Sequence, residues 1–213
     1  TIRSLSFFLM KPGLFIDLPY VWNMYNKIST LLLLIPIFSY SQTKDIMAEK
    51  SFYIINTQKD IGLNYWSIVN DDVMGGISKS YLSLNDKKNL VFNGYLSLDN
   101  NGGFASSRLS FPKETLSGVK SFKIKVKGDG NIYKLRFRQN NRRASYSCDF
   151  QSLKDEWIEI NLNVDEFKPY WRGYAYNDYP TLEVSEVNSL GIQISDKQEG
   201  EFQLEVKYIK AIY

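Results

Sequence analysis

The chain has 213 residues, a formal net charge of +3, one cysteine and no histidine. The length fits one domain, with or without processed segments, and an apolar content of 44% is sufficient for a hydrophobic core. The absence of histidine excludes Ser-His-Asp catalysis and histidine metal sites, and the single cysteine, Cys148, excludes an intrachain disulfide and a cysteine zinc cluster. A charge this small gives no electrostatic reason to expect binding to nucleic acid.

The N-terminal segment, residues 1–41, has the pattern of a secretory signal peptide behind an upstream extension. Met24 is the expected start, because it precedes a lysine, an apolar run over residues 28–38 and small residues up to Ser41. Cleavage after Ser41 predicts an exported chain, periplasmic or extracellular, with no stable membrane span in its mature form. An uncleaved N-terminal anchor is the alternative, although the run is short for a span. Residues 1–23 are interpreted as sequence upstream of the start.

The remainder of the chain predicts a polar linker over residues 42–49 and a folded domain over residues 50–213. Apolar and charged residues alternate most clearly at residues 121–127 and 132–138, which is typical of half-buried strands. Predicted strands cover residues 51–56, 66–69, 78–84, 90–98, 104–111, 121–127, 132–138, 146–150, 157–162, 190–194 and 202–208. Helical periodicity is nearly absent, with a short helix at most over residues 181–188. Short strands at this spacing indicate an all-β sandwich of the jelly-roll type.

Two stretches rich in turn-forming residues lie at residues 70–78, N-D-D-V-M-G-G-I-S, and at residues 100–108, N-N-G-G-F-A-S-S-R. Asn and Asp side chains bond to neighbouring backbone groups and glycine allows positive φ, so fixed turns are expected rather than flexible loops. A third turn is expected at the Gly-Asp-Gly sequence of residues 128–130. The residues assigned a structural role in these signature turns are Asp71, Asp72, Gly75, Gly76, Gly102, Gly103, Arg108 and Asp129.

The acidic residues of these turns also suit two functional interpretations. Oxygen-only ligands are typical of calcium sites, and carboxylates serve in acid–base catalysis. Carboxylates that are solvated or bonded to the backbone are the preferred interpretation, so no catalytic residue, no metal site and no cofactor is predicted, with a structural calcium ion as the alternative. Residues 74–76, Met-Gly-Gly, lack the lysine and the third glycine that phosphate-binding loops require.

Arg108 and Arg172 each permit two interpretations. An ion pair of either arginine with Asp71 or Asp72 would hold the turns together, and this is the expected arrangement. A bidentate clamp on a carboxylate ligand is the alternative. An arginine without an acidic partner would therefore indicate a ligand site.

The stretch Y-W-R-G-Y-A-Y-N-D-Y, residues 170–179, is predicted to be a long aromatic loop. Exposed aromatic side chains on a loop mark a binding surface, whereas plain packing is the alternative. The binding residues predicted from this loop are Tyr170, Trp171, Arg172, Tyr174 and Tyr176. Trp66 and Trp157 are assigned to the core, and Cys148 is assigned to a small buried position.

Five blocks of the sequence, taken in order, carry a family resemblance. They read N-Y-W-S-I-V-N-D-D-V-M-G-G-I-S, F-N-G-Y-L-S-L-D-N-N-G-G-F-A-S-S-R, K-G-D-G-N-I-Y-K-L-R-F-R, F-K-P-Y-W-R-G and G-I-Q-I-S-D-K-Q-E-G-E-F-Q-L-E-V-K-Y-I. Together they resemble the complex I intermediate-associated protein 30 family, over about residues 65–209. The resemblance implies a galactose-binding-domain-like jelly roll, shared with many carbohydrate-binding modules. It also implies a chaperone-like factor in the assembly of NADH:ubiquinone oxidoreductase rather than an enzyme.

The function expected from the sequence is therefore that of a non-enzymatic binding or assembly-factor-like module that engages a protein partner. The predicted export signal differs from the mitochondrial members of the family. An exported carbohydrate-binding module of the cell envelope, with a glycan partner, is accordingly the alternative. A groove surrounded by the aromatic residues 170–179 would favour the glycan. An enzyme acting on polysaccharide would require two carboxylates in an open cleft.

Overall fold

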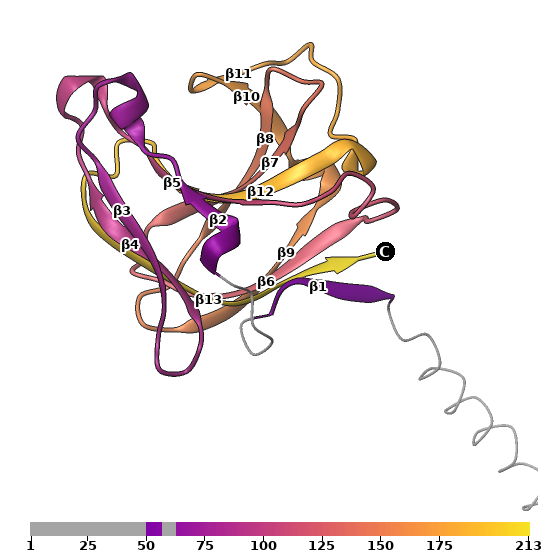
Figure 1. Ribbon diagram of the computed structural model, residues 1–213, viewed down its shortest axis with the longest axis horizontal. Coiled ribbons are helices and arrows are strands. Elements are labelled where there is room, and N and C mark those ends of the chain that lie inside the picture. Colours follow the sequence, from indigo (N-terminus) through magenta and orange to yellow (C-terminus); the bar gives the residue numbers. More distant parts are fainter. Residues whose placement is uncertain (1–49, 57–62) are drawn as a thin grey trace, which may run out of the picture. The chain divides into compact units, whose positions relative to one another are not determined.

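The computed structural model describes residues 50–56 and 63–213 (Figure 1). The predicted signal peptide, its cleavage point after Ser41 and the linker over residues 42–49 lie outside these residues. No helix within the described ranges combines the length and the apolar character needed to cross a membrane.

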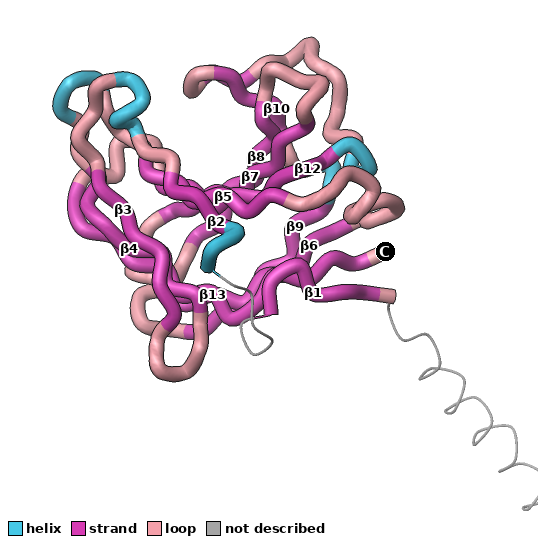
Figure 2. The backbone as a smooth tube through the Cα atoms, viewed as in Figure 1, coloured by secondary structure: helices cyan, strands magenta, loops and turns pink. Residues whose placement is uncertain are grey.

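The described residues form two antiparallel β-sheets that pack face to face (Figures 1 and 2). The first sheet has six strands in the order β3-β4-β13-β6-β9, and β1 pairs with the second half of β13. Its strands are β1 (Ser51–Asn56), β3 (Lys79–Leu84), β4 (Leu90–Leu96), β6 (Ser121–Lys127), β9 (Trp157–Asn163) and β13 (Gly200–Ile212). The predicted fold class, an all-β sandwich of jelly-roll type, is confirmed.

The second sheet has seven strands in the order β11-β10-β8-β7-β12-β5-β2. They are β2 (Trp66–Ile68), β5 (Ala105–Ser110), β7 (Ile132–Gln139), β8 (Ser145–Gln151), β10 (Lys168–Trp171), β11 (Tyr174–Ala175) and β12 (Val187–Ile194). The helical elements are short 3₁₀ turns: η1 (Leu63–Tyr65), η2 (Asp71–Met74), η3 (Asp99–Asn101), η4 (Val164–Glu166) and η5 (Val184–Glu186).

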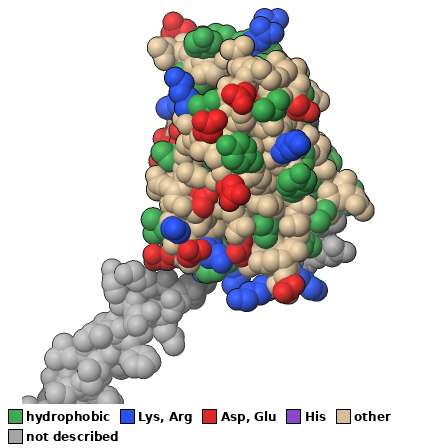
Figure 3. Space-filling model, turned by 90° about the vertical axis from the view of Figure 1, so that its left-hand side faces the viewer, with side chains coloured by type: hydrophobic (Ala, Val, Ile, Leu, Met, Phe, Trp, Pro, Cys, Tyr) green, Lys and Arg blue, Asp and Glu red, His purple; other side chains and the backbone are tan. Residues whose placement is uncertain are grey.

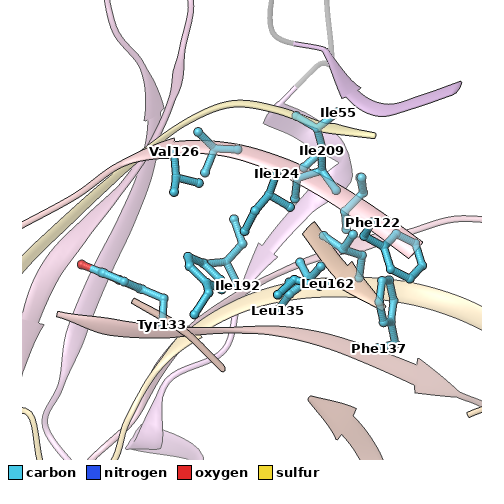
Figure 4. Close-up of a cluster of buried hydrophobic side chains, with 14 of the residues drawn as sticks. Ile55, Phe122, Ile124, Val126, Tyr133, Leu135, Phe137, Leu162, Ile192 and Ile209 are labelled. Carbon is cyan, nitrogen blue, oxygen red and sulfur yellow. The ribbon is translucent and has the colours of Figure 1, made fainter. Parts of the chain in front are cut away.

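The core lies between the two sheets, because successive residues of a strand point to opposite faces. The buried side chains that β6 and β7 contribute to it, drawn in Figure 4, are Phe122, Ile124, Val126, Tyr133, Leu135 and Phe137. The ring centroids of Phe122 and Phe137, which come from opposite sheets, lie 4.6 Å apart. Full burial of one such apolar side chain stabilises the fold by about 1.5–3 kcal/mol.

Two C-terminal elements differ from the sequence-based expectation. The single 3₁₀ turn η5 replaces the short helix expected over residues 181–188, and β12 begins at Val187 rather than at residue 190. Strand β13 continues to Ile212, because it exchanges one partner for another: its first half pairs with β4 and its second half with β1. A register shift against β6 between Val206 and Tyr208 interrupts the alternation, which explains why the pattern predicted an earlier end.

The outer face of the seven-stranded sheet positions the candidate site. Arg108 on β5 and Arg136 on β7 both lie opposite Gly191 on the intervening strand β12. Ser147 on β8 lies opposite Arg136 and therefore extends the same row. Polar and basic side chains thus lie across this face, and the apolar side chains at the alternating positions of the same strands fill the core.

Candidate functional site

A groove of about 490 Å³ lies on the outer face of the seven-stranded sheet. One wall is formed by the signature turns around η2 and η3, with Val73, Met74 and Phe104. The opposite wall is formed by the β10–β11 hairpin, with Tyr170 and Trp171. In Figure 1 the turns that precede β3 and follow β4 lie at the upper left, and β10 and β11 lie at the top, above β12.

The first wall is held together by the carboxylate of Asp71, which is fully buried. Its Oδ1 accepts a hydrogen bond from the backbone N–H of Ser78 at 2.9 Å, and its Oδ2 accepts one from the Ser78 hydroxyl at 2.5 Å. The same Oδ2 accepts from the N–H groups of Gly103 at 2.7 Å and Phe104 at 3.3 Å. One carboxylate therefore joins the turn at residues 70–78 to the turn at residues 100–108.

The electrostatics of Asp71 follow from these contacts. Burial raises the pKa of its carboxyl, but the hydrogen bonds from Ser78, Gly103 and Phe104 outweigh burial and hold the pKa below its ordinary value. Asp71 is thus an ionised group whose oxygens are already occupied. Asp72, its neighbour, is exposed.

The glycines of the signature turns are needed for close approach to this carboxylate. A Cβ atom at Gly76 would lie 2.4 Å from the Asp71 Cγ, and one at Gly102 would lie 2.7 Å from its Oδ2. Gly75 and Gly103 have positive φ angles of 94° and 128°, which L-residues rarely adopt. The glycines therefore allow the backbone of the two turns to enclose the buried carboxylate of Asp71.

Asp129, between β6 and β7, is likewise engaged in hydrogen bonds within the fold. Its carboxylate accepts hydrogen bonds from the backbone N–H of Asn131 at 2.9 Å, the Tyr133 hydroxyl at 2.9 Å and the backbone N–H of Gln203 at 2.7 Å. Within residues 50–56 and 63–213, no group of three or more His, Cys, Asp or Glu side chains is arranged to hold a metal ion.

The expected ion pair of Arg108 or Arg172 with Asp71 or Asp72 is not formed in the described part of the chain. Asp71 is satisfied by Ser78 and by backbone N–H groups, so it requires no arginine. Arg108 instead lies on the floor of the groove. Arg172 is exposed on the second wall, where its guanidinium carbon lies 5.6 Å from the Trp171 ring centroid.

Three arginines meet on the floor of the groove: Arg108, Arg136 and Arg138. We call them the arginine cluster. Arg136 donates from Nε to the Ser145 hydroxyl at 2.8 Å and from Nη1 to the Gln193 Oε1 at 2.7 Å. No arginine of the cluster forms an ion pair with an acid among the described residues. The cluster is therefore a concentration of positive charge with no acidic partner among residues 50–56 and 63–213.

The pKa values of the cluster reflect this arrangement. Burial lowers the pKa of Arg136 to about 10, and the charges of Arg138 and Arg108 lower it further in the same direction. The pKa of Arg108 is lowered by burial and by Arg138. Lys134, on the same face, has two acidic partners, because its ammonium lies 2.8 Å from Asp149 and 2.6 Å from Asp196.

The predicted binding residues of the aromatic loop fall into two groups. Tyr170, Trp171 and Arg172 line the groove. Tyr174 and Tyr176 are exposed but lie outside its lining. The expected long loop is in fact an edge hairpin, because Lys168–Trp171 pairs with both β8 and β11.

The tryptophan and cysteine assignments are also modified by the structure. Trp66 and Trp157 are only partly buried, and Lys127 lies over the Trp157 ring at 5.8 Å. Cys148 is half-buried rather than buried, and burial together with Glu166 and Asp149 raises the pKa of its thiol to about 11. A thiol with a raised pKa is a poor nucleophile at neutral pH.

The sequence did not single out Arg136, Arg138, Gly191 or Gln193 as site residues. The alternation at residues 132–138 correctly placed the basic residues away from the core, but it gave no sign that other elements enclose them in a groove. The sequence did contain an indication of this cluster. Arg108 and the arginines of the K-L-R-F-R pattern occupy outward positions on strands that belong to the same sheet.

The two sheets and the groove define the class of protein, a β-sandwich of the kind found among carbohydrate-binding modules. The family 11 carbohydrate-binding module of a cellulosomal cellulase of Clostridium thermocellum has a TM-score of 0.60 and 14% identity, covering 78% of this chain and 95% of the module. The family 11 module in complex with a β-1,3-1,4-mixed-linked tetrasaccharide has a TM-score of 0.56 and 14% identity, covering 78% and 96%. At this identity the likeness establishes the fold.

Residues 55–206 match the family model described as Complex I intermediate-associated protein 30. The chain therefore belongs to the complex I intermediate-associated protein 30 family, as the sequence resemblance implied. The mitochondrial complex I intermediate-associated protein 30 of Mus musculus is 22% identical to it over 190 residues, which cover 78% of this chain and 57% of that protein. The chain thus spans somewhat more than half the length of this curated relative.

The comparison corrects one expectation, the location. The sequence predicted an exported protein, periplasmic or extracellular, but the named relative is a mitochondrial protein, which points to a mitochondrial rather than an exported location. The prediction was wrong because an apolar run behind a basic residue is a weak criterion, and other targeting segments are also basic.

Proposed function

We propose that the protein is a non-enzymatic binding module of this family, which holds a segment of a partner protein in the groove of the seven-stranded sheet. The observation that carries the proposal is the groove itself, with apolar side chains lining both walls and basic side chains on its floor. The mouse relative is named for its association with an intermediate of complex I. An assembly intermediate is accordingly the kind of partner that we propose.

The apolar side chains of the first wall support a protein ligand. Val73 and Met74 are 68% and 59% exposed, and they lie on a turn whose backbone is fixed by Asp71. Covering apolar surface contributes roughly 25 cal/mol per Å². A rigid turn adds to this, since little conformational entropy is lost when a preorganised surface binds.

The chemistry of the titratable groups supports a role without catalysis. The oxygens of Asp71 and Asp129 are engaged in hydrogen bonds within the fold. Burial and the acids near Cys148 raise the pKa of its thiol. Arginines bind and position anions, but their pKa values make them poor general acids or bases.

A site-specific photo-crosslinker tests the proposal. We expect benzoylphenylalanine in place of Trp171, on the groove wall, to label a partner in an extract of the source cells. The matched control carries the same group in place of Tyr95, which is exposed on β4 of the other sheet. Labelling from position 95 but not from position 171 would contradict the proposal.

The mutation that accompanies this test is Met74→Ser with Val73→Ser. It removes apolar surface from the first wall while leaving the Asp71 hydrogen bonds in place. We expect the yield of the product labelled from position 171 to fall several-fold. An unchanged yield would place the partner elsewhere on the surface.

A carbohydrate ligand is the second candidate. Tyr170 and Trp171 present aromatic rings to the groove, and aromatic side chains with a few polar groups are typical of small-molecule sites. One similar module was solved with a β-1,3-1,4-mixed-linked tetrasaccharide. If this candidate is correct, titration with that tetrasaccharide will give a saturable change in tryptophan fluorescence, which Trp171→Ala removes. A flat titration at millimolar sugar would eliminate this ligand.

A further inference from the structure

The floor of the groove has an electrostatic arrangement that the proposed function does not by itself require. Seven basic side chains and one acidic side chain line the groove. The chain as a whole carries 26 basic and 23 acidic residues. Positive charge is therefore concentrated in the groove. On the face shown in Figure 3, acidic and basic side chains both occur among neutral ones.

The arginine cluster is the centre of this concentration. Arg108 and Arg136 lie on either side of Gly191, which has no side chain to separate them. Arg138 lies two residues further along β7 and lines the same part of the floor. Burial, and after it the charges of the neighbouring arginines, lower the pKa values of Arg136 and Arg108.

The acids near the floor do not neutralise the cluster. Asp149 and Asp196 both form ion pairs with Lys134. Asp71 is enclosed by Ser78, Gly103 and Phe104. The positive charge of Arg108, Arg136 and Arg138 thus has no acidic partner within the described part of the chain.

The donors of the cluster are placed to meet an anion. The Ser145 hydroxyl and the Gln193 amide oxygen hold the Arg136 guanidinium in a fixed orientation. Such a planar fork matches the two oxygens of a carboxylate or phosphate. Preorganised donors in a partly desolvated groove bind an anion more strongly than the same donors in open water.

We propose that the arginine cluster is an oxyanion site, which takes the side-chain carboxylate of an acidic residue in the partner segment. This inference rests on the proposed function, because it identifies the group of the partner that reaches the floor. Apolar Val73 and Met74 on one wall and Trp171 on the other flank the basic floor. That order fits an aspartate or glutamate with apolar neighbours better than it fits a free inorganic anion.

The test uses the full chain and two labelled hexapeptides, acetylated and amidated so that their ends are uncharged. One has two central glutamates between leucines, and the other has glutamines in their place. We expect the glutamate peptide to bind at least tenfold more tightly in fluorescence anisotropy. We expect Arg108→Gln with Arg138→Gln to abolish this preference. Equal binding of the two peptides, or an unchanged preference in the double variant, would overturn the proposal.

Lys125→Gln is the matched control, because Lys125 lies on β6 of the other sheet and its loss changes the net charge in the same direction. We expect it to retain the preference for the glutamate peptide, and an equal loss in this control would refute a localised site. Near-ultraviolet circular dichroism checks that each variant is folded.

Two further arms separate the possible sources of the anion. Inorganic phosphate is titrated alone, and a third hexapeptide offers only a free C-terminal carboxylate. Binding of phosphate or of that terminus, without binding of the glutamate peptide, would overturn the assignment to an acidic side chain.

The outcome also distinguishes this inference from the proposed function. Labelling of the partner from position 171 with no preference for the glutamate peptide would reject the inference alone. If the protein neither labels a partner from position 171 nor prefers the glutamate peptide, the inference and the proposed function are both rejected.

Discussion

Asp71 accepts four hydrogen bonds from two turns that are separated by more than twenty residues in the sequence. A hydrogen bond to a charged group contributes about 1.5–3 kcal/mol. Because these bonds fix the first wall of the groove, the residue determines the shape of the site without touching its floor.

We expect Asp71→Asn to lower the free energy of unfolding by about 2–4 kcal/mol. The amide is neutral, and its NH₂ group would face the N–H and O–H groups that donate to the carboxylate. Urea denaturation measures the change. Asp72→Asn is the control, because Asp72 is exposed and surface substitutions usually stay within about 0.5 kcal/mol. A loss of the same size in both variants would show that the buried hydrogen bonds of Asp71 are not responsible.

The pKa of Asp71 gives stability a defined dependence on pH. Burial raises the pKa of Asp71, but hydrogen bonding lowers it by more, so the pKa in the folded protein lies below the ordinary value of 3.8. Ionised Asp71 therefore makes its full contribution to the stability of the fold above the pKa of the unfolded state. That contribution is lost as the pH falls through the pKa of the folded state. We expect the wild-type protein to lose more stability than Asp71→Asn between about pH 5 and pH 2, as measured by urea denaturation. Parallel curves would contradict this.

At the level of elements, the contact between β5 and β12 is controlled by one glycine. A Cβ atom at Gly191 would lie 2.7 Å from the Ser107 carbonyl oxygen, so a side chain at this position would push the two strands apart. Arg108 belongs to β5 and Arg136 to β7. A displacement of β12 between those strands would change the distance across the floor of the groove.

We expect Gly191→Ala to destabilise the fold by about 1–3 kcal/mol, the usual cost of overpacking, and to weaken binding of the glutamate peptide. Ser189→Ala is the control, because Ser189 lies on the same face of β12 and already has a Cβ atom. Unfolding in urea and peptide anisotropy give the two values. If the alanine at position 191 changes neither, the strands have room to adjust.

The same elements show how far a sequence can predict this fold. The period of two in residues 121–127 and 132–138 identified which side chains enter the core, because it follows from strand geometry alone. The partners of β13 were not predictable in this way. They depend on pairing between Gly200–Val206 and the distant Leu90–Leu96, which no local pattern encodes.

The candidate site was only partly predictable for a related reason. Tyr170, Trp171 and Arg172 could be proposed from their own chemistry. The role of Arg136 and Arg138 depends on two walls built from residues 69–74 and 170–173, which enclose an otherwise solvated face. The predicted ion pair between Asp71 and Arg108 is wrong because the sequence does not show that Ser78 and Gly103 donate to the Asp71 oxygens.

At the level of the whole molecule, a chain of small net charge presents a strongly basic groove in its described part. Such a distribution attracts an acidic partner over distances up to about a Debye length, roughly 10 Å at 0.1 M salt.

We expect the association rate of the glutamate peptide to fall roughly tenfold between about 0.05 and 0.5 M NaCl, with a much smaller change in its dissociation rate. Stopped-flow anisotropy measures both rates. Arg138→Gln should reduce the salt dependence, whereas Lys125→Gln should leave it unchanged. An association rate independent of salt would exclude electrostatic steering by the groove.

Strand β13 has a consequence for how the protein is made. It is the last strand described, yet it lies at the centre of its sheet, bonded to β4, β1 and β6. The six-stranded sheet therefore cannot close during synthesis until residues 200–212 have left the ribosome. At a synthesis rate of about 5–20 residues per second, several seconds pass between the synthesis of β4 and that of its partner β13. During that interval its apolar face is open to contact with other chains, so the risk of aggregation is greatest before the last strand has been made.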